Sequence, residues 1–201
     1  SPYVNTAAGI VQRLATSYGT PSERFTSGDI DTVQMAAFDA AHPQPVGVFL
    51  SDRSNVLQVC QDLAASVGAQ VTMSREGKLR LVKIDLPPTG TPVEIKPSDY
   101  EAQSLSISRR STVIAGVRLG FCKNWTVQTA IDSGIPGEHR DLFSQEYLSV
   151  SARDSLVASD YRLYAEPQQV DTLLLKRTDA SAEASRRLNL WKQPRTVYQV
   201  I

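Results

Sequence analysis

Residues that could perform acid–base chemistry are few in this sequence and lie far apart. The two histidines are His42, beside a proline turn, and His139, in a loop-like segment, and neither is accompanied by a Ser or Cys whose context indicates an activated nucleophile. Asp29 and Asp31 form the best local pair of carboxylates, but capping of a helix explains them more economically than catalysis does. A hydrolase with Asp29 or Glu138 as its acid stays an alternative, because a glycosidase needs only two carboxylates.

The motifs that identify common enzyme classes are missing. The chain has no Gly-x-Ser-x-Gly elbow, no phosphate-binding loop ending in Gly-Lys-Ser/Thr and no His-Glu-x-x-His pair. Cys60 and Cys122 have no Cys-x-x-Cys or paired-histidine spacing, so they predict no zinc site. We expect two small buried thiols rather than a disulfide. The sequence therefore predicts no metal, no cofactor and no catalysis by this chain.

Arginine and tryptophan are the residues that point to binding. Of the 21 basic residues, 15 are Arg, and Arg tolerates burial in an interface better than Lys does. Because Arg and Trp dominate binding hot spots, we expect contacts with other proteins at Arg118, Trp125, Arg186 and Arg187. The alternative is that Trp125 packs in the core and that the arginines are solvated.

Composition and charge define the broad class. The chain has 201 residues, 41% of them hydrophobic and 21% charged, which excludes a disordered tail, a collagen-like repeat or a small disulfide scaffold. The 21 basic residues balance the 21 acidic ones, so no surplus of positive charge indicates a specific nucleic-acid partner. No apolar run reaches the length of a membrane span, and the N-terminus lacks the layout of a signal peptide.

The first part of the chain has helical periodicity followed by a hairpin pattern. Apolar residues at helical spacing predict helices over 7–18, over 33–40 with Asp29 or Asp31 as the cap, and from Ser54 to Val67 with Gly68 after its end. Residues 46–50 predict a buried strand or an extended link, and 70–74 with 79–84 predict a β-hairpin. We expect residues 1–90 to form an α+β subdomain of three helices and one hairpin.

The second part begins after the proline-rich stretch 86–97, where we place the subdomain boundary. Alternating patterns predict strands, and Gly116 and Gly120 on either side of Arg118 leave room for a second backbone to approach. The predicted elements are strands over 104–108, 113–121, 170–176 and 196–201, a loop over 131–141, an undetermined stretch over 142–155 and a helix over 179–192. We expect residues 91–201 to be a β-rich subdomain, each subdomain having a short antiparallel sheet packed with helices. The pattern of the last strand, 196–201, stops before it is complete, so we expect a fragment of a longer polypeptide.

Several segments, taken in order, resemble the central portion of the hub or tip proteins of long-tailed bacteriophages. The most specific is Gly120-Phe121-Cys122-Lys123-Asn124-Trp125-Thr126-Val127-Gln128, which is similar to a Tyr-x-Arg-Asn-Trp-Thr run of such tail proteins, although Phe121 and Lys123 replace its Tyr and Arg. The other matching segments are 8–14, 30–47, 57–81 and 179–188. These segments are spread, in this order, across nearly the whole chain.

This resemblance implies a structural protein of the phage virion, made in the host cytoplasm, that connects the distal tail tube to tip fibres or a spike. It implies a homotrimer in the full-length protein and contacts with the tail tube, the distal tail, the tape measure and the fibres. The chain would be an accessory α+β portion inserted between the core barrels of the hub.

Two alternatives stay open beside the structural role. One is a cell-wall hydrolase carried on the tail, with the acids named above. The other is a carbohydrate-binding module that contacts the host receptor through Trp125, Tyr147 or Tyr161 as a sugar platform. Exposure of these aromatic side chains is a condition for the second alternative.

Overall fold

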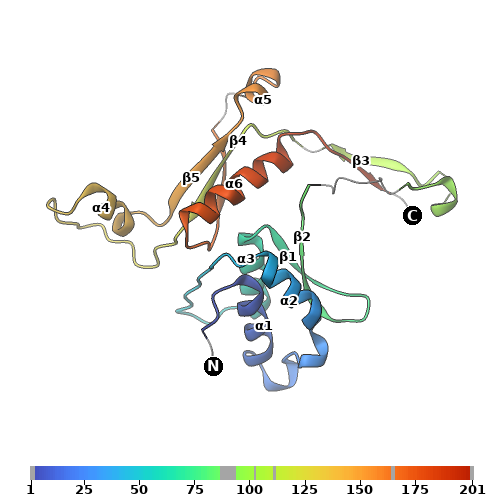
Figure 1. The fold of residues 1–201 in the computed structure, drawn as a ribbon, viewed down its shortest axis with the longest axis horizontal. Helices are drawn as coiled ribbons and strands as arrows, with labels where there is room; N and C mark the ends of the chain where they lie inside the picture. The colour runs from blue at the N-terminus through green and yellow to red at the C-terminus, as the bar shows by residue number, and fades with distance from the viewer. Residues whose placement is uncertain (1–2, 87–93, 102, 111, 164–165, 200–201) are drawn as a thin grey trace.

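The computed structural model describes residues 3–86, 94–101, 103–110, 112–163 and 166–199, and it confirms the predicted α+β class. Residues 3–86 form the N-terminal lobe, drawn in blue to green in Figure 1. This lobe contains the three helices and the hairpin predicted from the sequence. They are α1 (Ala7–Ser17), α2 (Thr32–Ala41), α3 (Val56–Ser66), β1 (Ala69–Met73) and β2 (Leu79–Lys83), with the 3₁₀ turns η1 (Pro21–Glu23) and η2 (Ser27–Asp29) between α1 and α2.

Side chains with short polar groups fix where these helices begin. The Thr6 hydroxyl accepts from the Gly9 amide at 3.3 Å, and the Asp31 carboxylate accepts from the Gln34 amide at 3.1 Å. Asn55, rather than the Ser54 predicted to open the helix, caps α3 by accepting from the Leu57 amide at 2.9 Å. Each cap satisfies an amide that the first helical turn leaves without a partner.

A three-stranded sheet forms the centre of the C-terminal lobe, which we define as residues 112–163 and 166–195. Its strands are β4 (Gly116–Phe121), β5 (Leu148–Arg153) and β6 (Gln168–Asp171), in the order β5-β4-β6. We predicted an antiparallel sheet here, but the sheet is mixed, because β6 pairs parallel to β4. After β5 and α5 (Ser155–Asp160), the chain reverses direction but joins the far edge of β4 instead of the free edge of β5.

Helix α6 (Arg177–Trp191) covers one face of this sheet, as Figure 1 shows. Alternation along β4 turns Val117, Leu119 and Phe121 toward the core, where they are buried. Ala180 and Ala184 of α6 are buried in the same cluster, so the helix packs closely on the sheet. The opposite face of the sheet is polar and open.

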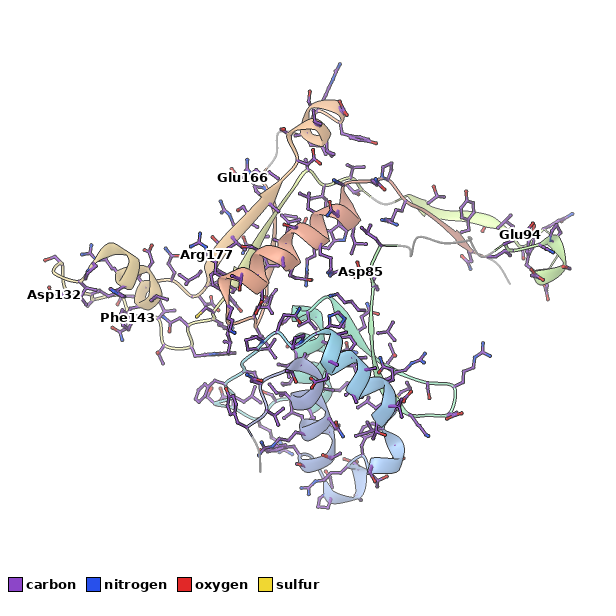
Figure 2. All side chains as sticks on the ribbon, viewed as in Figure 1. Asp85, Glu94, Asp132, Phe143, Glu166 and Arg177 are labelled. Carbon is purple, nitrogen blue, oxygen red and sulfur yellow. The ribbon has the colours of Figure 1, made fainter. Side chains whose placement is uncertain are left out.

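Two segments project from the body of the molecule (Figure 1). The first is an antiparallel ribbon of β3 (Ser106–Arg110) and β7 (Thr196–Gln199), preceded by the 3₁₀ turn η3 (Pro97–Asp99). The second follows β4 and carries α4 (Gly137–Ser144), where Figure 2 labels Asp132 and Phe143. The sequence predicted β3 and β7 but neither α4 nor α5, because both helices are short and expose their apolar residues. The alternation over 104–108 predicts a buried side formed by Leu105 and Ile107, but Leu105 is 48% exposed, so the prediction is wrong for Leu105. The side chain of Ile107 lies outside the described residues.

One hydrophobic cluster extends from the N-terminal lobe into the sheet. The segment 172–175 links them, because the Gly47 amide donates to the Leu173 carbonyl at 3.0 Å and the Cys122 amide donates to the Leu174 carbonyl at 2.7 Å. The hydroxyl of Ser66, buried at the end of α3, accepts from the Leu173 amide at 2.9 Å. The division into subdomains near 86–97 stays a prediction.

The Ser66 hydrogen bond gives a test of this junction. In Ser66→Ala the buried Leu173 amide loses its acceptor, so we expect the free energy of unfolding to fall by about 1–3 kcal/mol. Ser185→Ala is the matched control, because the exposed Ser185 hydroxyl donates only to the Ser181 carbonyl of its own helix, and we expect a change below about 0.5 kcal/mol. Urea unfolding of the two variants measures the difference, and equal stability would contradict the role of Ser66.

Candidate functional site

A cleft of about 530 Å³ lies between α3 and the loop that follows β4. We call it the Trp125 cleft. Its lining comes from four parts of the chain that are distant in the sequence, and it includes the side chains of Asn55, Gln58, Asp62, Lys123, Trp125, Tyr147 and Asp171. The link 48–55, helix α3, the ends of β4 and β6 and the start of β5 therefore all contribute to one hollow.

Aromatic rings and one lysine form a wall of the Trp125 cleft. The Lys123 Nζ lies 4.4 Å from the centre of the Trp125 ring and 5.3 Å from the centre of the Tyr147 ring, within the range of cation–π attraction. Lys123 also pairs with Glu146 at 3.3 Å. Partial burial works to lower the pKa of Lys123, but the hydrogen bonds to Tyr147 and Glu146 raise it above its ordinary value. Lys123 is therefore a fixed positive charge between two rings.

Trp125 belongs to the surface of the molecule as well as to the cleft. Its side chain is 41% exposed and meets Phe49 in an edge-on arrangement with 6.3 Å between ring centres. The indole thus links the loop after β4 to the N-terminal lobe. The sequence left two roles open for Trp125, contact with other proteins and packing in the core. The exposed part of its side chain shows that Trp125 is not fully packed in the core.

Gly120 lets the polar and aromatic groups of the cleft approach β4. A Cβ atom at this position would lie 2.5 Å from the Asp171 Oδ1 and 3.2 Å from the Tyr147 ring. The sequence predicted that a glycine here leaves space for a backbone, whereas the space is filled by two side chains of the cleft. The Asp171 Oδ1 also accepts from the Gln169 Nε2 at 2.6 Å.

Arg186 and Arg187 make their contacts within the chain. Both guanidinium groups bind the carboxylate of Glu183, which is only 7% exposed, at 2.7 Å. Arg186 also donates to the Ile84 carbonyl at 2.6 Å, and Arg187 donates to the Ala65 carbonyl. Burial works to raise the pKa of Glu183, but the two arginines hold it below its ordinary value. We call these three side chains the Glu183 clamp, since they tie α6 to the ends of β2 and α3.

Gly68 leaves the space that the Glu183 clamp occupies. Its φ of +74° is a left-handed conformation, and a Cβ atom there would lie 1.8 Å from the Arg186 Nη2. The sequence identified Gly68 only as the residue that ends α3. The i, i+3 and i, i+4 spacing of Glu183, Arg186 and Arg187 is the signal that could have predicted the ion pairs.

The remaining contact and sugar-platform candidates lie elsewhere. Arg118 is exposed in the middle of β4, on the open face of the sheet between Ser151 and Gln169. Tyr161 is exposed after α5, beside the end of the sheet where β4 begins, whereas Trp125 follows the other end. The structure therefore brings Trp125 and Tyr147 together and leaves Arg118 and Tyr161 apart from them. Contacts of Arg118, Trp125, Arg186 and Arg187 with other proteins stay a prediction.

The acids proposed for catalysis do not form a site among the described side chains. The Asp29 carboxylate accepts from the Thr26 hydroxyl at 2.6 Å and from the Thr26 amide at 2.8 Å, and these bonds lower the pKa of Asp29. Asp29 and Asp31 thus have the capping roles that the sequence favoured, and a lowered pKa does not suit a general acid. The side chain of Glu138 lies outside the described residues.

Metal binding, membrane insertion and thiol chemistry find no support among the described residues. Within the ranges given above, no group of three or more His, Cys, Asp and Glu side chains is placed to hold a metal ion. No described helix has the length and apolar character needed to cross a bilayer. Cys60 and Cys122 are free thiols, Cys60 buried and Cys122 partly exposed, and burial raises the pKa of Cys60 to about 11.

His42 belongs to a charged group next to the Glu183 clamp. Its Nδ1 lies 3.4 Å from the Lys83 Nζ, and its ring packs against Phe38 with 4.5 Å between centres. Burial lowers the pKa of His42, and the charges of Lys83 and Arg186 lower it further against the opposite pull of Asp85 and Glu183. The group holds the end of α2 against β2 and α6.

Comparison with known proteins finds similarity to solved structures. No protein-family model and no curated protein matches the chain. A crystal structure of a tail protein from Neisseria meningitidis MC58 aligns with 96% of this chain at 13% sequence identity and a TM-score of 0.38. The chain spans about half of that protein, since 50% of its length is covered. A TM-score this low does not establish a common fold.

Gly68 gives a test of the Glu183 clamp. In Gly68→Ala the new methyl group displaces Arg186, so we expect the free energy of unfolding to fall by about 3 kcal/mol or more, as when one partner of a buried ion pair is lost. Gly77→Ala is the matched control, because Gly77 has a φ of +77° with no atom within 4 Å of the added methyl group, and we expect a loss of only about 1–2 kcal/mol. Similar losses in both variants would show that the clamp adds nothing at Gly68.

The lowered pKa of His42 makes the stability of the folded chain depend on pH. The folded state lowers the pKa of His42, so the unfolded chain binds more protons as the pH falls through the ordinary pKa of His, and stability decreases there. The free energy of unfolding, measured between pH 8 and pH 5.5, should fall toward acid and be flatter in His42→Asn. A slope in His42→Asn as steep as that of the wild type would contradict this role of His42.

Proposed function

We propose that this chain is a structural component of a phage tail tip or hub, part of a longer protein that connects the distal tail tube to tip fibres or a spike. In the virion the full-length protein forms a homotrimer and contacts the tube, the distal tail, the tape measure and the fibres. The resemblance of the segments around Trp125 and along the chain to hub proteins supports this role.

The observation that carries the proposal is the exposure of the two projecting segments, the β3–β7 ribbon and the segment that carries α4. Over residues 94–110 and 124–147, no side chain whose burial is described is buried, and the same holds for 196–199. The segments nevertheless expose large apolar side chains, namely Ile95, Leu105, Trp125, Val127, Leu142, Phe143 and Tyr198. A two-stranded ribbon is marginal by itself in water, and exposed apolar groups indicate surfaces that a partner covers.

The energy available from such a partner is substantial. Full burial of one Leu or Phe side chain is worth about 1.5–3 kcal/mol. Leu142 and Phe143 are adjacent in α4 and are 41% and 44% exposed, so both can enter one contact. The backbone of this segment is already ordered, because the Gln128 amide donates to the Phe143 carbonyl at 2.8 Å and Asn124 Nδ2 donates to the same carbonyl at 2.9 Å. A partner therefore binds a segment whose conformation is set in advance.

The rest of the molecule suits a scaffold. The Glu183 clamp and the shared core hold the two lobes in one arrangement, so that forces on a projecting segment pass into the body. A balance of 21 basic and 21 acidic residues favours close packing among neighbouring proteins over steering of a charged ligand.

A paired substitution in the phage that encodes the chain tests the role. Leu142→Ser with Phe143→Ser removes the apolar contact, so we expect fewer infectious particles, by tenfold or more, and loss of the protein from purified particles measured by mass spectrometry. The thermal unfolding midpoint of the isolated chain should change little, since both side chains are already exposed.

Leu156→Ser provides the matched control, because Leu156 of α5 is 74% exposed but lies outside both projecting segments. It should leave particle yield unchanged. Normal assembly with the double variant would overturn the proposed contact, and release of soluble fragments from purified peptidoglycan by the wild-type chain would favour the hydrolase alternative.

A further inference from the structure

We infer that the Trp125 cleft is a binding site for a neutral oligosaccharide of about two or three rings. The inference goes beyond the structural role and does not depend on it, because it rests on the residues of the cleft alone. The volume of about 530 Å³ falls within the range of about 300–1,000 Å³ that small-ligand sites occupy.

An apolar platform for a sugar ring is present. Trp125 and Tyr147 both line the cleft, and the indole keeps 41% of its surface exposed although Lys123 lies over its ring. A pyranose ring has an apolar face of C–H groups, and an aromatic side chain offers it a rigid surface at low cost in conformational entropy. Phe49 and the pairing of Lys123 with Glu146 fix the loop that carries the indole, so the platform exists before the ligand arrives.

Hydrogen-bonding groups with spare capacity lie around this platform. The Asp62 carboxylate accepts from the Gln58 Nε2 at 2.8 Å, and the Asp171 carboxylate accepts from the Gln169 Nε2 at 2.6 Å. Among the described side chains, neither carboxylate forms an ion pair. A carboxylate can accept about four hydrogen bonds, so each retains acceptor sites for the hydroxyl groups of a sugar.

The charge of the lining selects among ligand classes. Asp62 and Asp171 disfavour phosphate and nucleic acid, and the polar lining disfavours a purely apolar ligand. A cationic peptide is disfavoured because the positive charge of Lys123 beside the two rings repels it. A neutral ligand with one apolar face and many hydroxyl groups satisfies every part of the lining, and an oligosaccharide has both features.

Ligand-observed saturation-transfer NMR on the wild-type chain tests this inference with three neutral trisaccharides: maltotriose, chitotriose and mannotriose. We expect saturation transfer to at least one of them, with quenching of tryptophan fluorescence that gives its dissociation constant. Trp125→Ala should weaken binding of that trisaccharide by tenfold or more. Asp171→Asn, which keeps the shape of the side chain, should weaken it by about tenfold, since a hydrogen bond to a charged group is stronger than one to a neutral group.

Tyr161→Ala is the matched control, because Tyr161 is an exposed tyrosine at the other end of the sheet, and it should bind as the wild type does. Circular dichroism checks that each variant is folded. If Trp125→Ala is not folded, the binding measured for Asp171→Asn and Trp125→Phe tests the inference instead. Absence of binding to all three sugars, equal binding by Trp125→Ala, equal loss in Tyr161→Ala, or displacement of the sugar by trilysine would each overturn the inference. Because the experiment uses the isolated chain, its failure leaves the role in the tail untouched.

Discussion

The contacts of Arg186 and Arg187 with the buried Glu183, two-pronged for Arg186 and single for Arg187, are the interaction on which the arrangement of the two lobes depends. The same guanidinium groups reach the carbonyl of Ala65 near the end of α3 and that of Ile84 just after β2, so a single turn of α6 fixes two ends of the N-terminal lobe. Buried ion pairs contribute little net stability compared with apolar packing, but losing one partner is costly. We therefore see the clamp as a device that specifies one arrangement of the lobes, and Gly68 as the residue that makes space for it.

The sheet separates two kinds of surface. Its inner face, through Val117, Leu119 and Phe121, belongs to the core under α6, while its outer face stays polar. At the end of β4 the chain leaves the sheet and forms both the Trp125 cleft and the segment with α4. Positions that could bind a partner thus lie on loops that a rigid scaffold holds in place, which is where binding residues are most often found.

Local sequence patterns predicted most of the helices and strands, but they did not predict the Trp125 cleft. Helices α1, α2, α3 and α6 and the hairpin β1–β2 have strong periodicity and turn signals, so the sequence predicted them to within a few residues. Helix α4 has no side-chain cap and buries none of its described residues, and therefore has no apolar stripe to detect. The parallel pairing of β6 and the meeting of Asp62, Trp125, Tyr147 and Asp171 depend on tertiary packing, which no single segment encodes. From the sequence, Trp125 could be proposed as a contact residue, but the side chains that surround it could not be predicted.

The hydrogen bond from the Leu173 amide to Ser66 spans 107 residues, and the one from Arg187 to Ala65 spans 122. During synthesis on the ribosome, the helices and hairpin of the first lobe emerge long before the strand and helix that complete their core. Until residue 187 has left the exit tunnel, the Ala65 carbonyl near the end of α3 lacks its partner from α6. Contacts this distant slow folding, so the nascent chain passes through a long interval in which a chaperone or a neighbouring polypeptide can bind it.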